Sequence, residues 1–305
     1  MTAGRTCRHP IVIALLALAA AGVALSGPAA PLTAQQLPQL MPDDLFRRNI
    51  GQQGDMDRRF PPHRVMDNVY FVGTASLGAF LVTTPAGHIL VNSCFDRTVP
   101  LIQQSVEELG FDFADIRIVL GSHAHGDHMQ GDGLVKEMTG AQVMVMAEDV
   151  PLLHPDGDTS AHPIDRVLRD GDTVTLGGET LTAHRTPGHT PGCTSWEIDV
   201  QEAGQTYTAL INCSIGVNPN YQLYQNPDRP GIVEEYRFSY AKLRSLDIDI
   251  PLGSHPGMYN LEEKYPRIGQ TPNPFIDREG YLYEIAINEQ AMGLRLEEQR
   301  RAAGN

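Results

Sequence analysis

The stretch that decides the fold is Ile116-Arg117-Ile118-Val119-Leu120-Gly121-Ser122-His123-Ala124-His125-Gly126-Asp127-His128. It begins with a short apolar run that stops at a glycine, which predicts a buried strand followed by a loop. His123 and His125 are two residues apart, so their side chains point the same way in extended chain. Asp127 and His128 follow in the next turn. Imidazole and carboxylate are ligands that zinc accepts, so this stretch predicts a metal site at a strand end.

Two further histidines occupy loops of the same kind. His189 follows the predicted strand Thr180–Arg185, and His255 follows the predicted strand Ile248–Leu252. Glycines flank both histidines, and glycine lets the backbone approach a site closely. The three loops together offer five histidines and one aspartate. These are too many ligands for one tetrahedral zinc, and their number suits two zinc ions.

The remaining segments predict alternating strands and helices. Further strands are predicted at Val69–Gly73, Ala79–Thr83, Ile89–Asn92, Val143–Met146 and Thr173–Leu176, with a hairpin of Ser195–Val200 and Thr206–Asn212. Helices are predicted at Thr98–Leu109, Gly131–Met138, Ile232–Leu246 and Asp277–Arg301, whereas Gln35–Arg64 predicts a loosely packed arm and Glu148–Asp165 an irregular segment. This order predicts two similar halves that form one α/β sandwich with helices outside.

The first residues predict export. Arg5 and Arg8 precede an apolar run over residues 11–25, and small residues follow. This is the pattern of a secretory signal peptide, which we place at residues 1–34 with cleavage between residues 26 and 34. The run is shorter than the ~20 residues that span a bilayer, so no membrane anchor is expected after processing. The mature domain would comprise residues 35–305, in the periplasm or secreted.

The charge balance narrows the class of partner. The chain has a formal net charge of −14 at pH 7, and its charges are scattered rather than clustered. An acidic protein is a poor partner for nucleic acid, because phosphate binding depends on Lys and Arg. We therefore expect a small-molecule substrate and no nucleic-acid partner. Separately, we expect the protein to be a monomer.

The ligand residues resemble those of the metallo-β-lactamase superfamily, with HxHxDH at 123–128 followed by His189 and His255. The segments Asn92-Ser93, Ser214–Asn218 and Asn273-Pro274-Phe275 are similar to those of the B3 subclass. The resemblance implies an αβ/βα four-layer sandwich with two mixed sheets and helices outside. It also implies two Zn²⁺ ions, the first held by His123, His125 and His189 and the second by Asp127, His128 and His255.

The activity implied by the resemblance is hydrolysis of the β-lactam amide of penicillins, cephalosporins and carbapenems by a zinc-bound hydroxide, which would confer antibiotic resistance. Asp127 would orient the hydroxide and Tyr221 would donate to the carbonyl oxygen. Ser214, Asn218 and Tyr221 would bind the substrate. The alternatives are another hydrolase of this fold, such as a lactonase or thioesterase, or a non-catalytic zinc protein. Many of those hydrolases have a bridging aspartate where this chain has Asn212-Cys213-Ser214.

The cysteines and the other histidines have separate predictions. Cys193 and Cys213 lie within one register step in the predicted hairpin, and some B3 enzymes resemble this arrangement, so a disulfide is predicted between them. Cys94 is predicted to be a buried thiol. Packing or surface roles are predicted for His63, His88, His154, His162 and His184, although His154 and His162 could border the groove.

Overall fold

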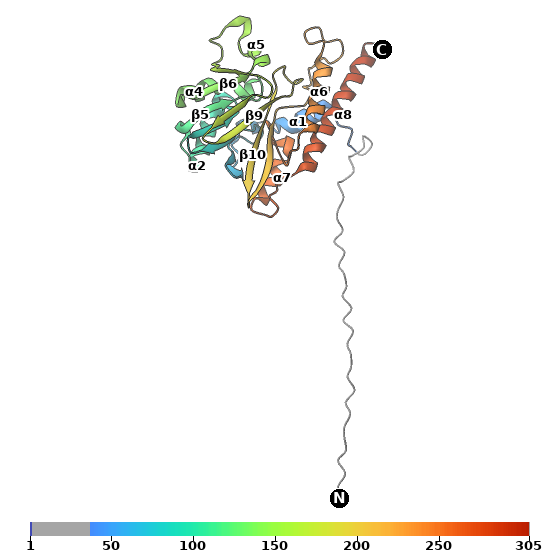
Figure 1. Ribbon diagram of the computed structural model, residues 1–305. Coiled ribbons are helices and arrows are strands. Elements are labelled where there is room, and N and C mark those ends of the chain that lie inside the picture. The colour runs from blue at the N-terminus through green and yellow to red at the C-terminus, as the bar shows by residue number, and fades with distance from the viewer. Residues whose placement is uncertain (2–36, 305) are drawn as a thin grey trace.

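The computed structural model describes residues 37–304 together with Met1. Figure 1 shows this part as a layered body in which helices cover both faces of the β-structure. The predicted signal peptide, apart from Met1, lies outside the described residues, as do residues 35 and 36 of the predicted domain. Within the described residues, no helix is both long and apolar enough to cross a membrane.

Two mixed β-sheets form the centre of the fold. The first has seven strands in the order β1-β2-β3-β4-β5-β6-β7, and the second has five in the order β12-β11-β10-β9-β8. The strands of the first sheet are β1 (His63–Met66), β2 (Val69–Phe71), β3 (Phe80–Thr84), β4 (Gly87–Val91), β5 (Ile116–Leu120), β6 (Gln142–Met146) and β7 (Arg166–Leu168). Those of the second are β8 (Thr173–Leu176), β9 (Glu179–Arg185), β10 (Thr194–Glu202), β11 (Gln205–Asn212) and β12 (Ile250–Gly253).

The helices are α1 (Pro42–Ile50), α2 (Val99–Glu108), α3 (Gly126–Met129), α4 (Asp132–Thr139), α5 (Val150–Leu153), α6 (Ile232–Ser245), α7 (Leu261–Lys264) and α8 (Arg278–Ala302). Of these, α2, α4, α6 and α8 pack on the outer faces of the two sheets. One apolar core lies between the sheets, where Phe80 and Trp196 are both buried. A second core joins the first sheet to α2 and α4, and a third joins the second sheet to α6 and α8. The predicted four-layer α/β sandwich is therefore confirmed.

Parallel strand pairs bring the predicted ligand loops to one edge. β4 and β5 run parallel with Val91 opposite Leu120, and β11 and β12 run parallel with Asn212 opposite Gly253. Parallel neighbours end on the same side of a sheet. The loops after β4 and β5 therefore lie side by side, as do the loops after β11 and β12, and the rings of His128 and His255, 4.9 Å apart, join the two sets.

The N-terminal segment differs from the prediction. Gln35–Arg64 was predicted to be a loosely packed arm, yet α1 lies within it and Leu45 is buried against Ile287 and Ala291 of α8. The guanidinium of Arg48 makes a two-pronged ion pair with the buried Glu284, at 2.9 and 2.6 Å. An amphipathic helix that has such a docking surface packs tightly even when it is short.

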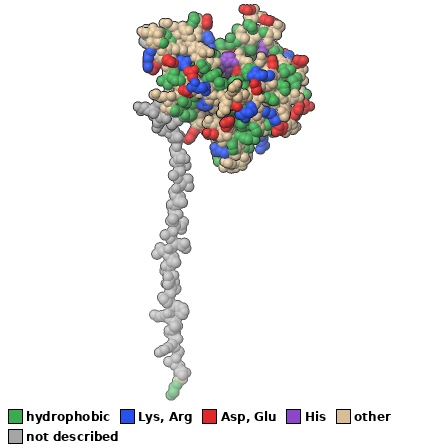
Figure 2. Space-filling view, turned by 180° about the vertical axis from the view of Figure 1, so that it is seen from behind, with side chains coloured by type: hydrophobic (Ala, Val, Ile, Leu, Met, Phe, Trp, Pro, Cys, Tyr) green, Lys and Arg blue, Asp and Glu red, His purple; other side chains and the backbone are tan. Residues whose placement is uncertain are grey.

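The surface mixes charges of both signs. Figure 2 shows Lys and Arg interspersed with Asp and Glu on the face that it presents, and histidine is visible in the upper part of that face.

The strands β1 and β7, which are not predicted from the sequence, are four and three residues long and close the two edges of the first sheet.

Candidate metal centre

The loop after β5 is held at its base by Asn92. The Asn92 amide accepts a hydrogen bond from the Ser122 backbone N–H at 2.9 Å and donates one to the Gly78 carbonyl at 2.9 Å. At the other end of the loop, the His128 carbonyl accepts hydrogen bonds from the backbone N–H groups of Ser93 and Cys94, both at 3.1 Å. The first histidine loop is therefore fixed at both ends by the loop after β4.

The first cluster consists of His123, His125 and His189. Their ring centroids are 4.6–4.8 Å apart, and one nitrogen from each lies within 4.8 Å of the others. The Nδ1 atom of His189 is hydrogen-bonded to the Gly216 carbonyl at 2.8 Å, which leaves Nε2 as its free nitrogen. A carbonyl partner of this kind fixes the tautomer and the orientation of a metal ligand.

The second cluster consists of Asp127, His128 and His255. Oδ2 of Asp127 lies 3.3 Å from Nε2 of His128 and 3.8 Å from Nε2 of His255. The Nδ1 atom of His255 is hydrogen-bonded to the Ser76 carbonyl at 2.8 Å, so its Nε2 is the nitrogen that faces Asp127. The His123 and His128 rings are 4.3 Å apart, which makes the two clusters adjoin.

The chemistry of these atoms fits bound metal. Nε2 of His123 and both ring nitrogens of His128 are buried without a hydrogen-bond partner, which is costly unless another ligand satisfies them. Burial and the neighbouring imidazoles hold the pKa of His123 and His189 well below the usual value and lower the pKa of His255 to about 4. Neutral imidazole is the form that binds a metal.

The same surroundings keep the aspartate ionised. Burial alone would raise the pKa of Asp127, but the imidazoles of His128, His255 and His125 outweigh burial and hold this pKa below its usual range. The cluster thus offers neutral imidazoles and a carboxylate, which together form a donor set suited to zinc.

A buried aspartate, Asp149, ties the ligand loops together and was missed in the sequence analysis. Its carboxylate accepts hydrogen bonds from the Ala124 N–H at 2.8 Å, the Thr190 hydroxyl at 2.8 Å and the Gly192 N–H at 2.6 Å. It therefore joins the loop of His123 and His125 to the loop of His189. Its position at the end of β6 was the only signal available, because β6 runs parallel to β5 and ends at the same edge.

The structure contains the predicted disulfide between Cys193 and Cys213, which are 20 residues apart and have Cα atoms 5.9 Å from each other. It links the start of β10 to the end of β11 beneath the first cluster, where Sγ of Cys213 lies 3.5 Å from Nδ1 of His123. Cys94 is buried, as predicted, and burial raises the pKa of its thiol. The bridge braces the loops of His189 and Ser214.

The three predicted substrate residues lie on two sides of the centre. Ser214 and Asn218 line a cavity of about 220 Å³ together with His125, Asp127 and His255. Tyr221 lines a neighbouring groove instead, and its hydroxyl donates to the His189 carbonyl at 2.7 Å. The predicted donation from Tyr221 to a substrate carbonyl stays a prediction.

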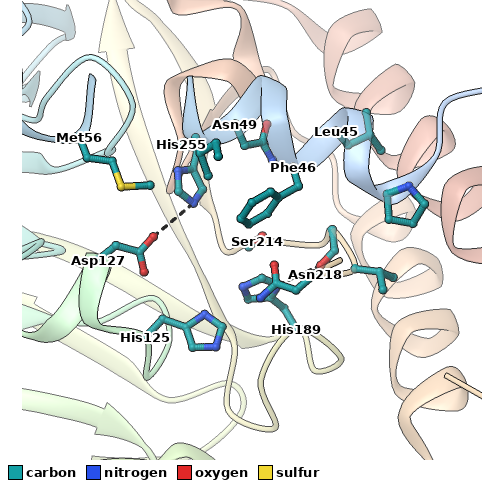
Figure 3. A pocket seen from close by; sticks show the side chains of 14 residues that line it. Leu45, Phe46, Asn49, Met56, His125, Asp127, His189, Ser214, Asn218 and His255 are labelled. Atoms are coloured by element: carbon teal, nitrogen blue, oxygen red, sulfur yellow. Dashed lines mark hydrogen bonds and ion pairs between the residues drawn. The ribbon is translucent and has the colours of Figure 1, made fainter. Parts of the chain in front are cut away.

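An unpredicted apolar wall faces the metal ligands. Pro42, Leu45 and Phe46 of α1, together with Met56, line the same cavity. Figure 3 shows Phe46 and Met56 directed into the hollow that contains Asp127, His189 and His255. The sequence signal was weak but present, since α1 opens with Pro42 and two acidic residues, a pattern typical of a helix start.

The other five histidines of residues 37–304 lie outside the clusters and line neither the cavity nor the groove. His162 is buried with Nε2 3.2 Å from Oδ2 of Asp132, and Nε2 of His154 is hydrogen-bonded to the His162 carbonyl at 2.7 Å. His63 stacks on Phe71. His88 is buried, and His184 pairs with Glu197.

Known proteins share this arrangement. The family model described as the metallo-beta-lactamase superfamily matches residues 79–255. The native FEZ-1 metallo-beta-lactamase from Legionella gormanii is 44% identical, with a TM-score of 0.76 over 80% of this chain and 98% of that chain. BJP-1, a subclass B3 metallo-beta-lactamase of Bradyrhizobium japonicum, is 35% identical, with a TM-score of 0.76 over 82% of this chain and 98% of that chain.

Curated relatives share a smaller region. A hydroxyacylglutathione hydrolase from Hyphomonas neptunium is 37% identical over 139 residues, which is 45% of this chain and 49% of the relative. The chain thus spans about half the length of this relative, and less of several others that it matches.

Proposed function

This chain belongs to the metallo-beta-lactamase superfamily, and we propose that it is a zinc-dependent β-lactamase of the B3 type. The observation that carries the proposal is the end of β11, where Asn212, Cys213 and Ser214 supply no carboxylate and Cys213 is bound in a disulfide. Ser214 reaches the cavity that contains Asp127 and His255. The extensive similarity to FEZ-1 supports the same assignment.

The ligands divide between two zinc ions. We assign the first zinc to His123, His125 and His189, and the second to Asp127, His128 and His255. When bound, zinc supplies a Lewis acid and lowers the pKa of water to about 7. The two zinc sites would be neighbours, because the donor atoms of His123 from the first site and of Asp127 and His128 from the second lie within 4.8 Å of one another.

The side chains of this protein would orient the reactants. The carbonyls of Gly216 and Ser76 hold His189 and His255 with Nε2 facing the centre. Asp127 is ionised and can orient an attacking water or hydroxide by accepting a hydrogen bond from it. Ser214 and Asn218 would hold the carboxylate of a β-lactam substrate, since a hydroxyl and an amide can both donate to it.

The proposals for cellular location, domain extent and partners are those made from the sequence. We propose that residues 1–34 direct export and that residues 35–305 form one catalytic domain in the periplasm or outside the cell. We propose a monomer that binds a small-molecule substrate and no nucleic acid.

The test is turnover of a penicillin, a cephalosporin and a carbapenem, each with and without a chelator, alongside metal analysis. We expect hydrolysis that stops on chelation and returns with zinc, and about two zinc ions per chain. Asp127→Ala should lose orders of magnitude in kcat while its circular dichroism is unchanged. Near-normal turnover by Asp127→Ala would contradict its assigned role.

The second candidate is a thioesterase, which the 37% identity to a hydroxyacylglutathione hydrolase over 139 residues favours. A homoserine lactone and a glutathione thioester belong in the same assay. Turnover of the thioester with no turnover of any β-lactam would replace the first proposal with the second.

A further inference from the structure

A second hollow, which we call the Tyr221 groove, opens beside the metal cavity. His125 and His189 line both hollows, whereas Tyr221, Asn226 and Arg229 line only the groove. The groove has a volume of about 570 Å³, against about 220 Å³ for the metal cavity. A substrate held at the histidine clusters therefore has room to extend past Tyr221.

The two hollows differ in chemistry. The metal cavity is walled by apolar side chains such as Phe46, and no Lys or Arg is among its lining residues. Arg229 is the one cation that lines the Tyr221 groove. Asp228 lines the groove as well, but Asp228 is exposed and Arg229 is half-buried, so water screens the carboxylate more strongly.

Arg229 is held in place before any substrate binds. The Asn226 amide oxygen accepts hydrogen bonds from the N–H groups of Asp228 at 2.9 Å and Arg229 at 2.8 Å, and its nitrogen donates to the Gln222 carbonyl at 2.7 Å. Nη2 of Arg229 pairs with Glu235. A guanidinium has five N–H donors, so this pair leaves others for a ligand.

Tyr221 joins the groove to the centre. Its hydroxyl donates to the His189 carbonyl at 2.7 Å and lies 3.4 Å from Nε2 of His125. The groove that Arg229 lines therefore opens directly onto the first histidine cluster.

The direction of a bound β-lactam follows from the proposed function, on which this inference rests. Its ring carboxylate is on the nitrogen side of the amide, and its acyl substituent is on the carbonyl side. Ser214 and Asn218 would take the ring carboxylate in the metal cavity. The acyl substituent then extends past Tyr221, and we infer that Arg229 is a specificity-determining residue that favours substrates with a negatively charged acyl substituent.

The test compares benzylpenicillin with its α-carboxy derivative, which differs only by a carboxylate on the acyl side. The measured quantity is the ratio of kcat/KM for the carboxylated penicillin to that for the plain one. A partly screened ion pair corresponds to a change of about three- to tenfold. We expect Arg229→Ala to lower the ratio by that factor, mainly through KM, and Arg229→Lys to retain part of it.

Two further variants sharpen the result. Glu235→Gln removes the competing carboxylate and should raise the ratio, which tests the inference even if Arg229→Ala fails to fold. Arg237→Ala removes a charge from an exposed position on α6 that does not line the groove, so the ratio should stay at the wild-type value. Added salt should lower the ratio in the wild type and not in Arg229→Ala.

Each outcome has one meaning. An unchanged ratio in both Arg229→Ala and Glu235→Gln, or an equal fall in Arg237→Ala, overturns the role of Arg229 while leaving the proposed function intact. A wild-type protein that loads zinc yet hydrolyses neither penicillin overturns the proposed function, and the inference fails with it.

Discussion

Replacing Asp149 should separate the loops that carry the first histidine cluster. The Asp149 carboxylate is buried and accepts from Ala124, Thr190 and Gly192. In Asp149→Ala these three donors lose their acceptor. Asp149→Asn keeps the shape but presents an NH₂ group to N–H or O–H donors, so it should also be destabilising.

The size of the effect follows from the hydrogen bonds and the burial. A hydrogen bond to a charged group contributes about 1.5–3 kcal/mol. Part of that gain is offset, because burial raises the pKa of Asp149 and so penalises its charged form. We expect Asp149→Ala to lower the free energy of unfolding by about 3–5 kcal/mol. Zinc affinity at the first cluster should fall about 10–100-fold, the usual cost of losing a group that orients metal ligands.

Two assays check these values. Urea unfolding of the metal-free protein measures stability, and competition with a chromophoric chelator measures zinc affinity. Asp158→Asn is the matched control, because Asp158 is exposed and its carboxylate accepts hydrogen bonds from the neighbouring Ser160 rather than from a ligand loop. If Asp149→Ala unfolds at the wild-type urea concentration and binds zinc normally, the reasoning is refuted.

Three other perturbations have defined outcomes. Replacing Cys193 and Cys213 with serine should lower the unfolding free energy by about 3 kcal/mol, because the disulfide closes a loop of 20 residues in the unfolded chain. A loss below about 1 kcal/mol in thermal unfolding would contradict this. Arg48→Ala leaves the Glu284 carboxylate buried without its cation and should lower the unfolding free energy by about 1–3 kcal/mol. Proteolysis within α1 should be faster in the variant than in the wild type, and equal rates would argue against this prediction. The metal-free protein should lose stability as pH falls from 6.5 toward 4, because His255 takes up a proton in the unfolded chain at a higher pH than in the folded protein. The expected loss is about 1.4 kcal/mol per unit of pKa difference. An unfolding free energy that does not change over this range would contradict the effect of burial on His255.

The ligand loops could be predicted because their signals are local. An apolar run closed by a glycine specifies where β5 ends, and the spacing of His123 and His125 specifies that they project together. The helices α2, α4, α6 and α8 were predicted to within two residues, and α2 and α4 end next to a glycine, which is a local stop signal. Register in the hairpin β10–β11 likewise placed Cys193 near Cys213.

The walls of the site depend on contacts between distant residues, which a local pattern does not contain. Helix α1 is stabilised by the Arg48–Glu284 pair, whose members are 236 positions apart. Asp149 meets Gly192 across 43 positions. In the sequence, α1 is one short apolar cluster in a polar, proline-containing segment, and tertiary packing decides that it is ordered.

This division between local and distant contacts explains why the relatives point to two activities. The hydroxyacylglutathione hydrolase matches less than half of this chain, whereas FEZ-1 matches four-fifths of it. The histidine loops supply the metal chemistry that several hydrolases share. Under the proposed function the substrate would meet the remainder, because Phe46 and Ser214 line the metal cavity and Arg229 lines the Tyr221 groove. Exchanging these walls should therefore change the substrate while the zinc content stays the same. Thioester hydrolysis gained by Ser214→Asp would demonstrate it, and no change of substrate in that variant would contradict it.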